Sequence, residues 1–126
     1  MANKYGVKVG DLFRAVWGYE QTNNDFFQVL ELVGETFVRV RQVEPEMLAS
    51  KRYSSGMAED RIYKIPTEIL PPTCHSLFIK DQERGDLKKI KSYQRDGSKP
   101  LFKMSSYADA YKVEGDTLEC YESWYY

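Results

Sequence analysis

Side chains that could act as a nucleophile or a base are scarce in this chain. The only histidine, His75, stands beside Cys74, just after Pro71 and Pro72. Neighbouring side chains point in opposite directions on an extended chain, so this adjacency does not pair a thiol with an imidazole base. We interpret the pair as a loop thiol and a solvated imidazole, and we expect no catalytic residue and no enzymatic activity.

The residue spacing also argues against metal and cofactor chemistry. The two cysteines, Cys74 and Cys120, form no CxxC or Cys/His pattern, which speaks against a zinc site and against a disulfide framework. Gly97 and Gly115 stand alone in expected turns, so there is no glycine-rich phosphate loop. A group of acidic residues could meet at one rim of a barrel, but it lacks a DxD spacing and a histidine partner, so we expect no metal and no cofactor. This group consists of Asp11, Glu20, Asp25 and Glu31.

The most informative stretch spans residues 17–28, WGYEQTNNDFFQ, where an apolar strand runs into residues without aliphatic side chains and then becomes apolar again. Two interpretations remain open. In the first, this is a recognition loop whose rings stack and whose amides read a base edge or a peptide. In the second, Gly18 permits a tight bend, the polar side chains cap backbone groups, and Trp17 packs in the core. The binding residues that the first interpretation predicts are Trp17, Tyr19, Gln21, Thr22, Asn23 and Asp25.

The C-terminal part of the chain is rich in residue types that anchor protein interfaces. Its aromatic residues are Tyr107, Tyr111, Tyr121, Trp124, Tyr125 and Tyr126. Part of this set must be buried, yet consecutive residues of a strand face opposite sides, so Tyr125 and Tyr126 cannot both point inward. We therefore add Tyr125 and Tyr126 to the predicted binding residues.

Two basic tracts interleaved with aromatic residues offer a competing site. They comprise Arg39, Arg41, Lys51 and Arg52, and then Lys88, Lys89, Lys91, Arg95, Lys99 and Lys103. If the tracts share one face, they would bind phosphate backbones. Otherwise they are solvated strand edges, where lysine blocks edge-to-edge aggregation. We favour the second interpretation.

Length and charge bound the remaining choices. The 126 residues fit a single domain over positions 1–126. With 18 basic and 19 acidic side chains the formal charge is -1, so the surface as a whole should not attract nucleic acid or an anionic membrane. The N-terminus has no apolar signal region, and no apolar run approaches the roughly 20 residues of a membrane span. We expect a soluble, cytoplasmic protein.

Alternation of apolar and polar residues predicts the strands that position these side chains. Residues 11–17, 26–33 and 36–43 alternate with the period of a strand. The Gly34-Glu35 step between the last two predicts a hairpin with a two-residue type II′ turn. Residues 87–93 and 100–104 flank Arg95-Asp96-Gly97-Ser98, where the Asp-Gly step predicts a second hairpin.

The rest of the chain reads less regularly. Residues 44–81 contain four prolines and a polar run, which predicts an irregular excursion with short strands at 61–65 and 77–80. The stretch SSYADAYKVEGD reads as a polar-aromatic loop, and residues 117–126 predict the last strand. Aromatic residues make up 14% of the chain, which suits pleated sheets. The predicted fold class is mainly β: a small, bent, SH3-like antiparallel barrel with an irregular proline-rich central excursion, in which both ends of the chain form ribbons.

Four segments of the chain form a distinctive set: VGDLF, WGYEQTNNDFFQVLE, TFVRVRQV and KMSSYADAYKVEGDTLECYESWYY. Together they resemble a family of small uncharacterised proteins encoded by bacteriophages and related mobile elements. Members of that family carry a WGY-[DE]-QTN-x-DF-[YF]-QV motif, and the resemblance covers residues 9–43 and 98–126. This chain departs at the closing turn, KVEGDT, where a Trp-Asp-Gly-Lys type of sequence is expected. The resemblance implies an accessory protein of a phage or prophage and carries over no catalytic residue.

These observations favour a non-enzymatic binding module that engages a protein partner, such as a host factor, through the polar-aromatic loop and the Tyr-rich end. The alternative is a nucleic-acid-binding SH3-like domain that uses the Lys/Arg hairpin. A neutral aromatic patch or a symmetric dimer contact would favour the first, and a contiguous positive face the second. A small hydrolase or nuclease would require a pocket with converging carboxylates or a histidine partner.

Overall fold

The computed structural model describes residues 2–18, 22–54, 56–74, 76, 78–95 and 99–123, and their regular structure is all β. The strands are β1 (Leu12–Trp17), β2 (Asn23–Val33), β3 (Phe37–Val43), β4 (Met47–Arg52), β5 (Ala58–Lys64), β6 (Asp86–Lys91), β7 (Leu101–Ser105), β8 (Ala108–Lys112) and β9 (Thr117–Ser123). Among the described residues, no helix is long and apolar enough to span a membrane.

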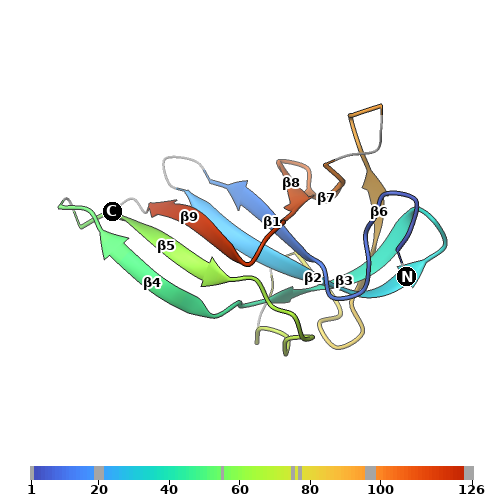
Figure 1. Ribbon diagram of the computed structural model, residues 1–126, viewed down its shortest axis with the longest axis horizontal. Helices are drawn as coiled ribbons and strands as arrows, with labels where there is room; N and C mark the ends of the chain where they lie inside the picture. Colours follow the sequence, from blue (N-terminus) through green and yellow to red (C-terminus); the bar gives the residue numbers. More distant parts are fainter. Residues whose placement is uncertain are drawn as a thin grey trace.

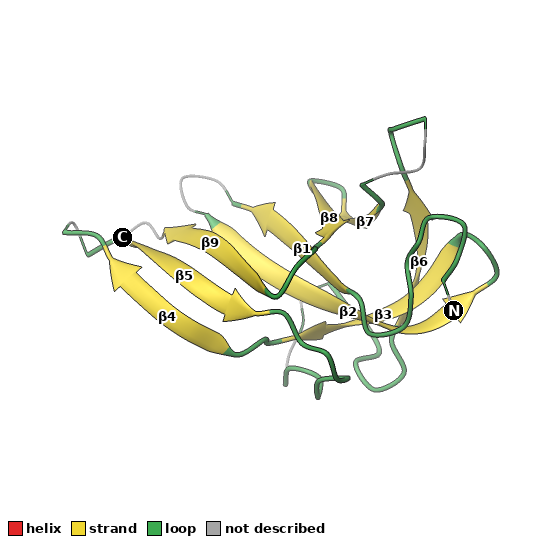
Figure 2. Ribbon diagram, in the orientation of Figure 1, coloured by secondary structure: helices red, strands yellow, loops and turns green. Residues whose placement is uncertain are grey.

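Six of these strands close into an antiparallel barrel in the order β1-β2-β3-β6-β7-β8. The remaining strands form a three-stranded sheet, β4-β5-β9, which lies along the outside of β1 and β2 (Figures 1 and 2). The predicted fold class, an all-β fold built on a small antiparallel barrel, is confirmed and is consistent with the SH3-like expectation. The expectation that both chain ends lie in the barrel is wrong, because β8 closes the barrel whereas β9 joins the second sheet.

The barrel is filled by every second residue of its strands, as the period of a strand requires. Phe13, Phe27 and Phe102 are fully buried, and the ring of Phe102 lies 5.1 Å from that of Phe13 and 5.7 Å from that of Phe27. Val38 and Val40 of β3 complete the buried face that the alternation of residues 36–43 predicts. Aromatic packing of this kind stabilises the barrel beyond the burial of its area.

A second apolar cluster joins the outer face of the barrel to the β4-β5-β9 sheet. Leu12, Phe26 and Val43 point outward from the barrel and meet Tyr63 and Cys120 of the sheet. The rings of Phe26 and Tyr63 lie 4.9 Å apart. This cluster explains why both faces of β1 and β2 are partly apolar in the sequence.

The loop within residues 17–28 is shorter than the polar composition of this stretch predicts. Strand β1 continues to Trp17 and β2 begins at Asn23, so three polar residues predicted as loop belong to a strand. Cross-strand side-chain bonds hold them there: Arg14 Nε donates to Asn24 Oδ1 at 2.8 Å, and Trp17 Nε1 donates to Asp25 Oδ2. Polar side chains are stable on a strand when they satisfy one another across the ladder.

Both predicted hairpins form, with differences in their turns. The β2–β3 hairpin pairs Val33 with Phe37, so residues 34–36 form the turn in place of the predicted two-residue connection. Gly34 still has a positive φ of 67°, which its missing side chain permits. Strands β6 and β7 pair through Ile90 and Phe102. The Asp96-Gly97-Ser98 part of their connection lies outside the described residues.

The predicted irregular excursion over 44–81 is wrong for its first half. Strands β4 and β5 form a hairpin there, and the short strand predicted at 61–65 is the end of β5. No strand forms at the described residues 78–80, and β8 lies within the stretch predicted as a polar-aromatic loop.

The second half of the excursion is irregular and is fixed by side chains of the barrel. Gln28, fully buried, donates from Nε2 to the carbonyls of Gly10 and Glu68 and accepts from the backbone N–H of Leu70. Arg41 donates to the carbonyl of Leu70 at 2.7 Å. A segment without regular structure needs such partners for its backbone groups.

Candidate functional site

An aromatic cluster closes the end of the barrel at which β1 stops. The Trp17 ring lies 5.6 Å from Phe78 of the excursion and 5.7 Å from Tyr107 of the β7–β8 turn. Trp17 and Phe78 are half-buried, whereas the Tyr107 side chain is 61% exposed. The cluster therefore belongs partly to the core and offers the Tyr107 ring to solvent. Trp17 packs against the core as the second interpretation expects, and its role in binding stays a prediction.

Beneath these rings lies a polar network centred on Asp25. Its two carboxylate oxygens accept from Trp17 Nε1 and, at 2.9 Å, from Gln42 Nε2, and Gln42 in turn accepts from the Ser76 hydroxyl. Burial raises the pKa of Asp25 above its ordinary value, and the two donated hydrogen bonds partly offset this increase. Through these two hydrogen bonds Asp25 holds the side chains of Trp17 and Gln42 in position.

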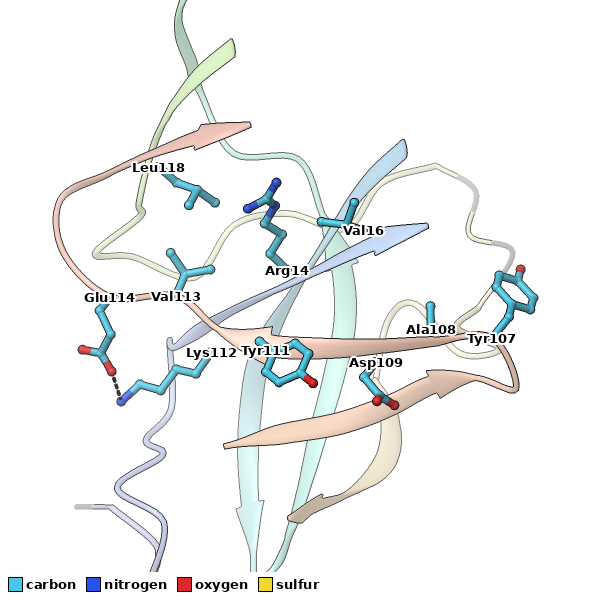
Figure 3. A pocket seen from close by; sticks show the side chains of 10 residues that line it. All are labelled: Arg14, Val16, Tyr107, Ala108, Asp109, Tyr111, Lys112, Val113, Glu114 and Leu118. Atoms are coloured by element: carbon cyan, nitrogen blue, oxygen red, sulfur yellow. Dashed lines mark ion pairs between the residues drawn. The ribbon is translucent and has the colours of Figure 1, made fainter. Parts of the chain in front are cut away.

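A groove of about 490 Å³ runs along the outer face of the barrel between β8 and β9 (Figure 3). It is lined by Val16 of β1, by Tyr107 of the β7–β8 turn and by Tyr111 of β8, which are 47%, 61% and 45% exposed. Leu118 of β9 forms the opposite wall. Exposed apolar side chains from β1, β8 and the β7–β8 turn therefore gather around this groove.

The charged residues of the groove nearly cancel one another. Lys112 makes ion pairs with Asp11 at 3.5 Å and with Glu114 at 3.3 Å. Arg14 and Asp109 also line the groove. Opposite charges in this balance favour neither a polyanion nor a polycation.

Asn24 links the groove to the neighbouring sheet. Its Oδ1 accepts from Arg14 Nε at 2.8 Å, and its Nδ2 donates to the Tyr121 carbonyl of β9 at 2.7 Å. Arg14 reaches from β1 toward β9 (Figure 3). Burial raises the pKa of the Cys120 thiol, and the positive charge of Arg14 partly offsets this increase. The described residues offer no carboxylate within ion-pair distance of this guanidinium.

Of the predicted binding residues, the structure describes four. Trp17 and Asp25 meet at the barrel mouth, and Asn23 pairs with Trp17 across the strands. Thr22 exchanges two backbone hydrogen bonds of 3.0 Å with Ser123 and so ties β2 to β9. The other predicted binding residues, Tyr19, Gln21, Tyr125 and Tyr126, lie outside the described residues, as does His75.

The basic tracts do not merge into one face. Arg39 and Arg41 point outward from β3 and donate to backbone carbonyls of Gly85, Glu83 and Leu70, which makes them structural. Lys51 and Arg52 lie on β4 in the other sheet.

The lysines that remain on the barrel wall border a smaller hollow of about 280 Å³ over β6, β7 and β8. It is lined by Lys91, Lys103, Tyr93 and Tyr107, and Tyr93 is 71% exposed. Amines beside exposed rings are the elements of a site for single-stranded nucleic acid.

A cavity of about 210 Å³ between the barrel and the second sheet is bordered by a network of ion pairs. Arg61 bonds to Glu59 and, at 3.2 Å, to Glu122, and Asp25 lines the same cavity. Burial raises the pKa of Glu122, and the nearby Arg61 partly offsets this. Within the described residues, no group of His, Cys, Asp or Glu side chains could hold a metal ion. Cys74 is exposed on the excursion and follows Thr73, which lines this cavity.

Sequence reasoning missed Arg14, Val16 and Asn24. Alternation put Arg14 and Val16 on the mixed face of β1, and that face becomes the groove floor. No local signal shows that β9 runs beside it, since the pairing of Thr22 with Ser123 joins distant parts of the chain. Comparisons with known proteins assign no role to these surfaces, because no family model, curated protein or solved structure matches this chain.

Proposed function

We propose that this chain is a non-enzymatic binding module that docks a protein partner on the groove between β8 and β9. The observation that carries the proposal is the exposure of Val16, Tyr107 and Tyr111 around one hollow. Apolar side chains left in water at one place mark interaction surfaces, and tyrosine is enriched among residues that anchor interfaces.

The charge of the groove supports a protein partner over a polyanion. Lys112 is neutralised by Asp11 and Glu114, and the groove holds one further cation, Arg14, and one further anion, Asp109, which form no ion pair with each other. Binding would therefore depend on apolar contact and hydrogen bonds and would respond weakly to salt. The resemblance to proteins of bacteriophages makes a cytoplasmic host protein the favoured partner.

The test is affinity capture from a lysate of the host cell, with and without nuclease. Tyr111→Ser removes a ring from the groove, while the matched variant Tyr93→Ser removes an exposed ring from the β6–β7 side. We expect a partner that survives nuclease, is lost with Tyr111→Ser and is kept with Tyr93→Ser. Capture that is unaffected by Tyr111→Ser would overturn the proposal.

A second candidate function is binding of single-stranded nucleic acid on the hollow over β6, β7 and β8. Lys91 and Lys103 supply positive charge there, and Tyr93 supplies an exposed ring. Such binding weakens steeply with salt. An oligonucleotide that binds the wild type, loses affinity with Tyr93→Ser and shows this salt dependence would favour the second function.

A further inference from the structure

Strand β9 is an edge of the second sheet, and its pairing with β5 fixes which backbone groups are open. The ladder is antiparallel and pairs Cys120 with Arg61 and Leu118 with Tyr63. Ser123 N–H and C=O bond to Thr22, on the side away from β5. Because successive residues of a strand direct their backbone groups to alternate sides, Thr117, Glu119 and Tyr121 also direct theirs away from β5.

Most of these outward groups have no partner among the described residues. At the Tyr121 end, Asn24 Nδ2 caps the Tyr121 carbonyl at 2.7 Å, and the Thr22–Ser123 bridge closes the edge beyond it. The backbone groups of Thr117 and Glu119 remain open. Leu118, which lies between them in the chain, lines the groove that separates β9 from the barrel wall (Figure 3).

We propose that an extended segment of a partner protein adds to β9 as a further antiparallel or parallel strand and fills the groove. This inference rests on the proposed function and names the kind of partner. Main-chain hydrogen bonds to an open edge supply affinity, while pockets for alternate side chains supply specificity. Here the backbone groups of Thr117 and Glu119 would supply the bonds, and the floor formed by Val16 and Tyr111 would receive every second side chain.

Arg14 adds a chemical preference to this segment. Its Nε is held by Asn24, and its terminal amino groups lie at the groove without a carboxylate partner among the described residues. A guanidinium that is fixed in this way favours a carboxylate acceptor. The segment is therefore an extended peptide in which every second residue is apolar. It carries an Asp or Glu where it passes Arg14.

The opposite edge of the same sheet lacks these features. Strand β4 also has an open side, but all its side chains are exposed and a bulge interrupts its pairing between Met47 and Ala49. Among the described strands, β4 lies on the side of the sheet opposite β9, away from β1 and β2 (Figures 1 and 2). The other edge is thus a control and not a competing site.

The experiment selects binders from a displayed library of random twelve-residue peptides on the full chain, and then measures the affinity of synthetic copies by fluorescence polarisation. Glu119→Pro removes an outward N–H without breaking a bond to β5, and proline is tolerated on edges. Glu119→Ala controls for the side chain. Ser50→Pro makes the matched change on the open side of β4. The unfolding midpoint of each variant verifies that it folds.

We expect the selected peptides to have an apolar residue at every second position and to contain an Asp or Glu. Glu119→Pro should weaken their binding about tenfold or more, which corresponds to roughly 1.4 kcal/mol. Glu119→Ala and Ser50→Pro should leave the affinity within about twofold, and Arg14→Met should weaken only the acidic peptides. If Glu119→Pro fails to fold, protection of the Glu119 amide from hydrogen exchange on peptide binding to the wild type replaces it.

Three results would overturn the inference: a library without binders, unchanged affinity in a folded Glu119→Pro variant, or an unprotected Glu119 amide in the complex. If binding falls with Tyr111→Ser but not with Glu119→Pro, strand addition is wrong and the proposed protein-docking function stands. If the Tyr111→Ser variant also captures the partner from the lysate as well as the wild type does, the proposed function fails too.

Discussion

Trp17→Phe tests whether the barrel mouth is held by the indole N–H or only by ring packing. The replacement keeps an aromatic ring near Phe78 and Tyr107, whose centroids lie 5.6 and 5.7 Å from that of Trp17. It removes the Nε1–H that donates to Asp25. The Asp25 carboxylate, which burial already disfavours, then loses one of its two side-chain donors.

The expected cost follows from the type of bond. A hydrogen bond to a charged group contributes about 1.5–3 kcal/mol, and the half-buried site favours the lower part of that range, about 1.5–2 kcal/mol. For a chain of this size 1 kcal/mol corresponds to about 4 °C, so the unfolding midpoint should fall by about 6–8 °C. Truncation to alanine also removes the ring, so Trp17→Ala should cost about 3 kcal/mol or more.

The loss of stability in Trp17→Phe should depend on pH, because the hydrogen bond that it removes ends on the titratable carboxylate of Asp25. Its pKa in the folded protein is raised above the ordinary 3.8, so the folded chain binds this proton more tightly than the unfolded chain. The contribution of Asp25 to stability therefore falls as the pH rises from 3.8 through the folded pKa. Trp17→Phe raises that pKa further, so its cost is complete above the folded pKa and shrinks when Asp25 is protonated.

Urea denaturation of the wild type and Trp17→Phe at pH 7 and at pH 3.5 measures both effects. Asp25→Asn, alone and combined with Trp17→Phe, provides a double-mutant cycle, and we expect a coupling of about 1 kcal/mol or more at pH 7. If the wild type and Trp17→Phe have equal urea midpoints at pH 7, the hydrogen bond from Trp17 to Asp25 does not stabilise the fold. A cost that is the same at both pH values would show that Asp25 is not the acceptor that matters.

Three further predictions concern the contacts between the barrel and the excursion, the turn before β6, and the two cysteines. Gln28→Leu leaves buried backbone groups of the excursion without partners and should cost about 3 kcal/mol in chemical denaturation; a neutral result would show that water replaces the amide. Gly85→Ala should destabilise by about 2 kcal/mol more than Gly115→Ala, although both have positive φ, because only at Gly85 would the new Cβ lie 3.0 Å from a backbone oxygen; equal thermal midpoints would contradict this contact. Iodoacetamide at pH 8 should modify exposed Cys74 and spare Cys120, which is 2% exposed and whose thiol pKa burial raises; mass spectrometry that finds both labelled in the folded chain would refute the burial of Cys120.

The sequence was most informative where one face of a strand is apolar. The alternation of Val38 and Val40 with Arg39 and Arg41 predicted both the β2–β3 hairpin and the inward residues. It could not show that these arginines bond to carbonyls of the excursion, because those contacts join residues about 30 to 46 positions apart. The sequence therefore indicated a basic surface tract, whereas Arg39 and Arg41 of that tract hold the excursion in place.

The missed strands share a physical reason. All residues of β4 are exposed, so its sequence has no alternation to detect, and it is held by backbone pairing with β5. In β8 the inward residues are Ala108 and Ala110, whose small side chains give little apolar contrast. The alternation of β9 predicts a strand but not its neighbour, since the same pattern serves a barrel and a separate sheet. The groove depends on that neighbour and so was not predictable.

The position of the bound partner tests the central claim most directly. The measurement is the change in backbone amide shifts of the isotope-labelled chain when the captured protein or a selected peptide is added. The account predicts the largest changes at Val16, Tyr111 and Glu119, around the groove between β8 and β9. Changes that are concentrated at Lys51 on β4, or at Lys91 and Lys103 on β6 and β7, would contradict it.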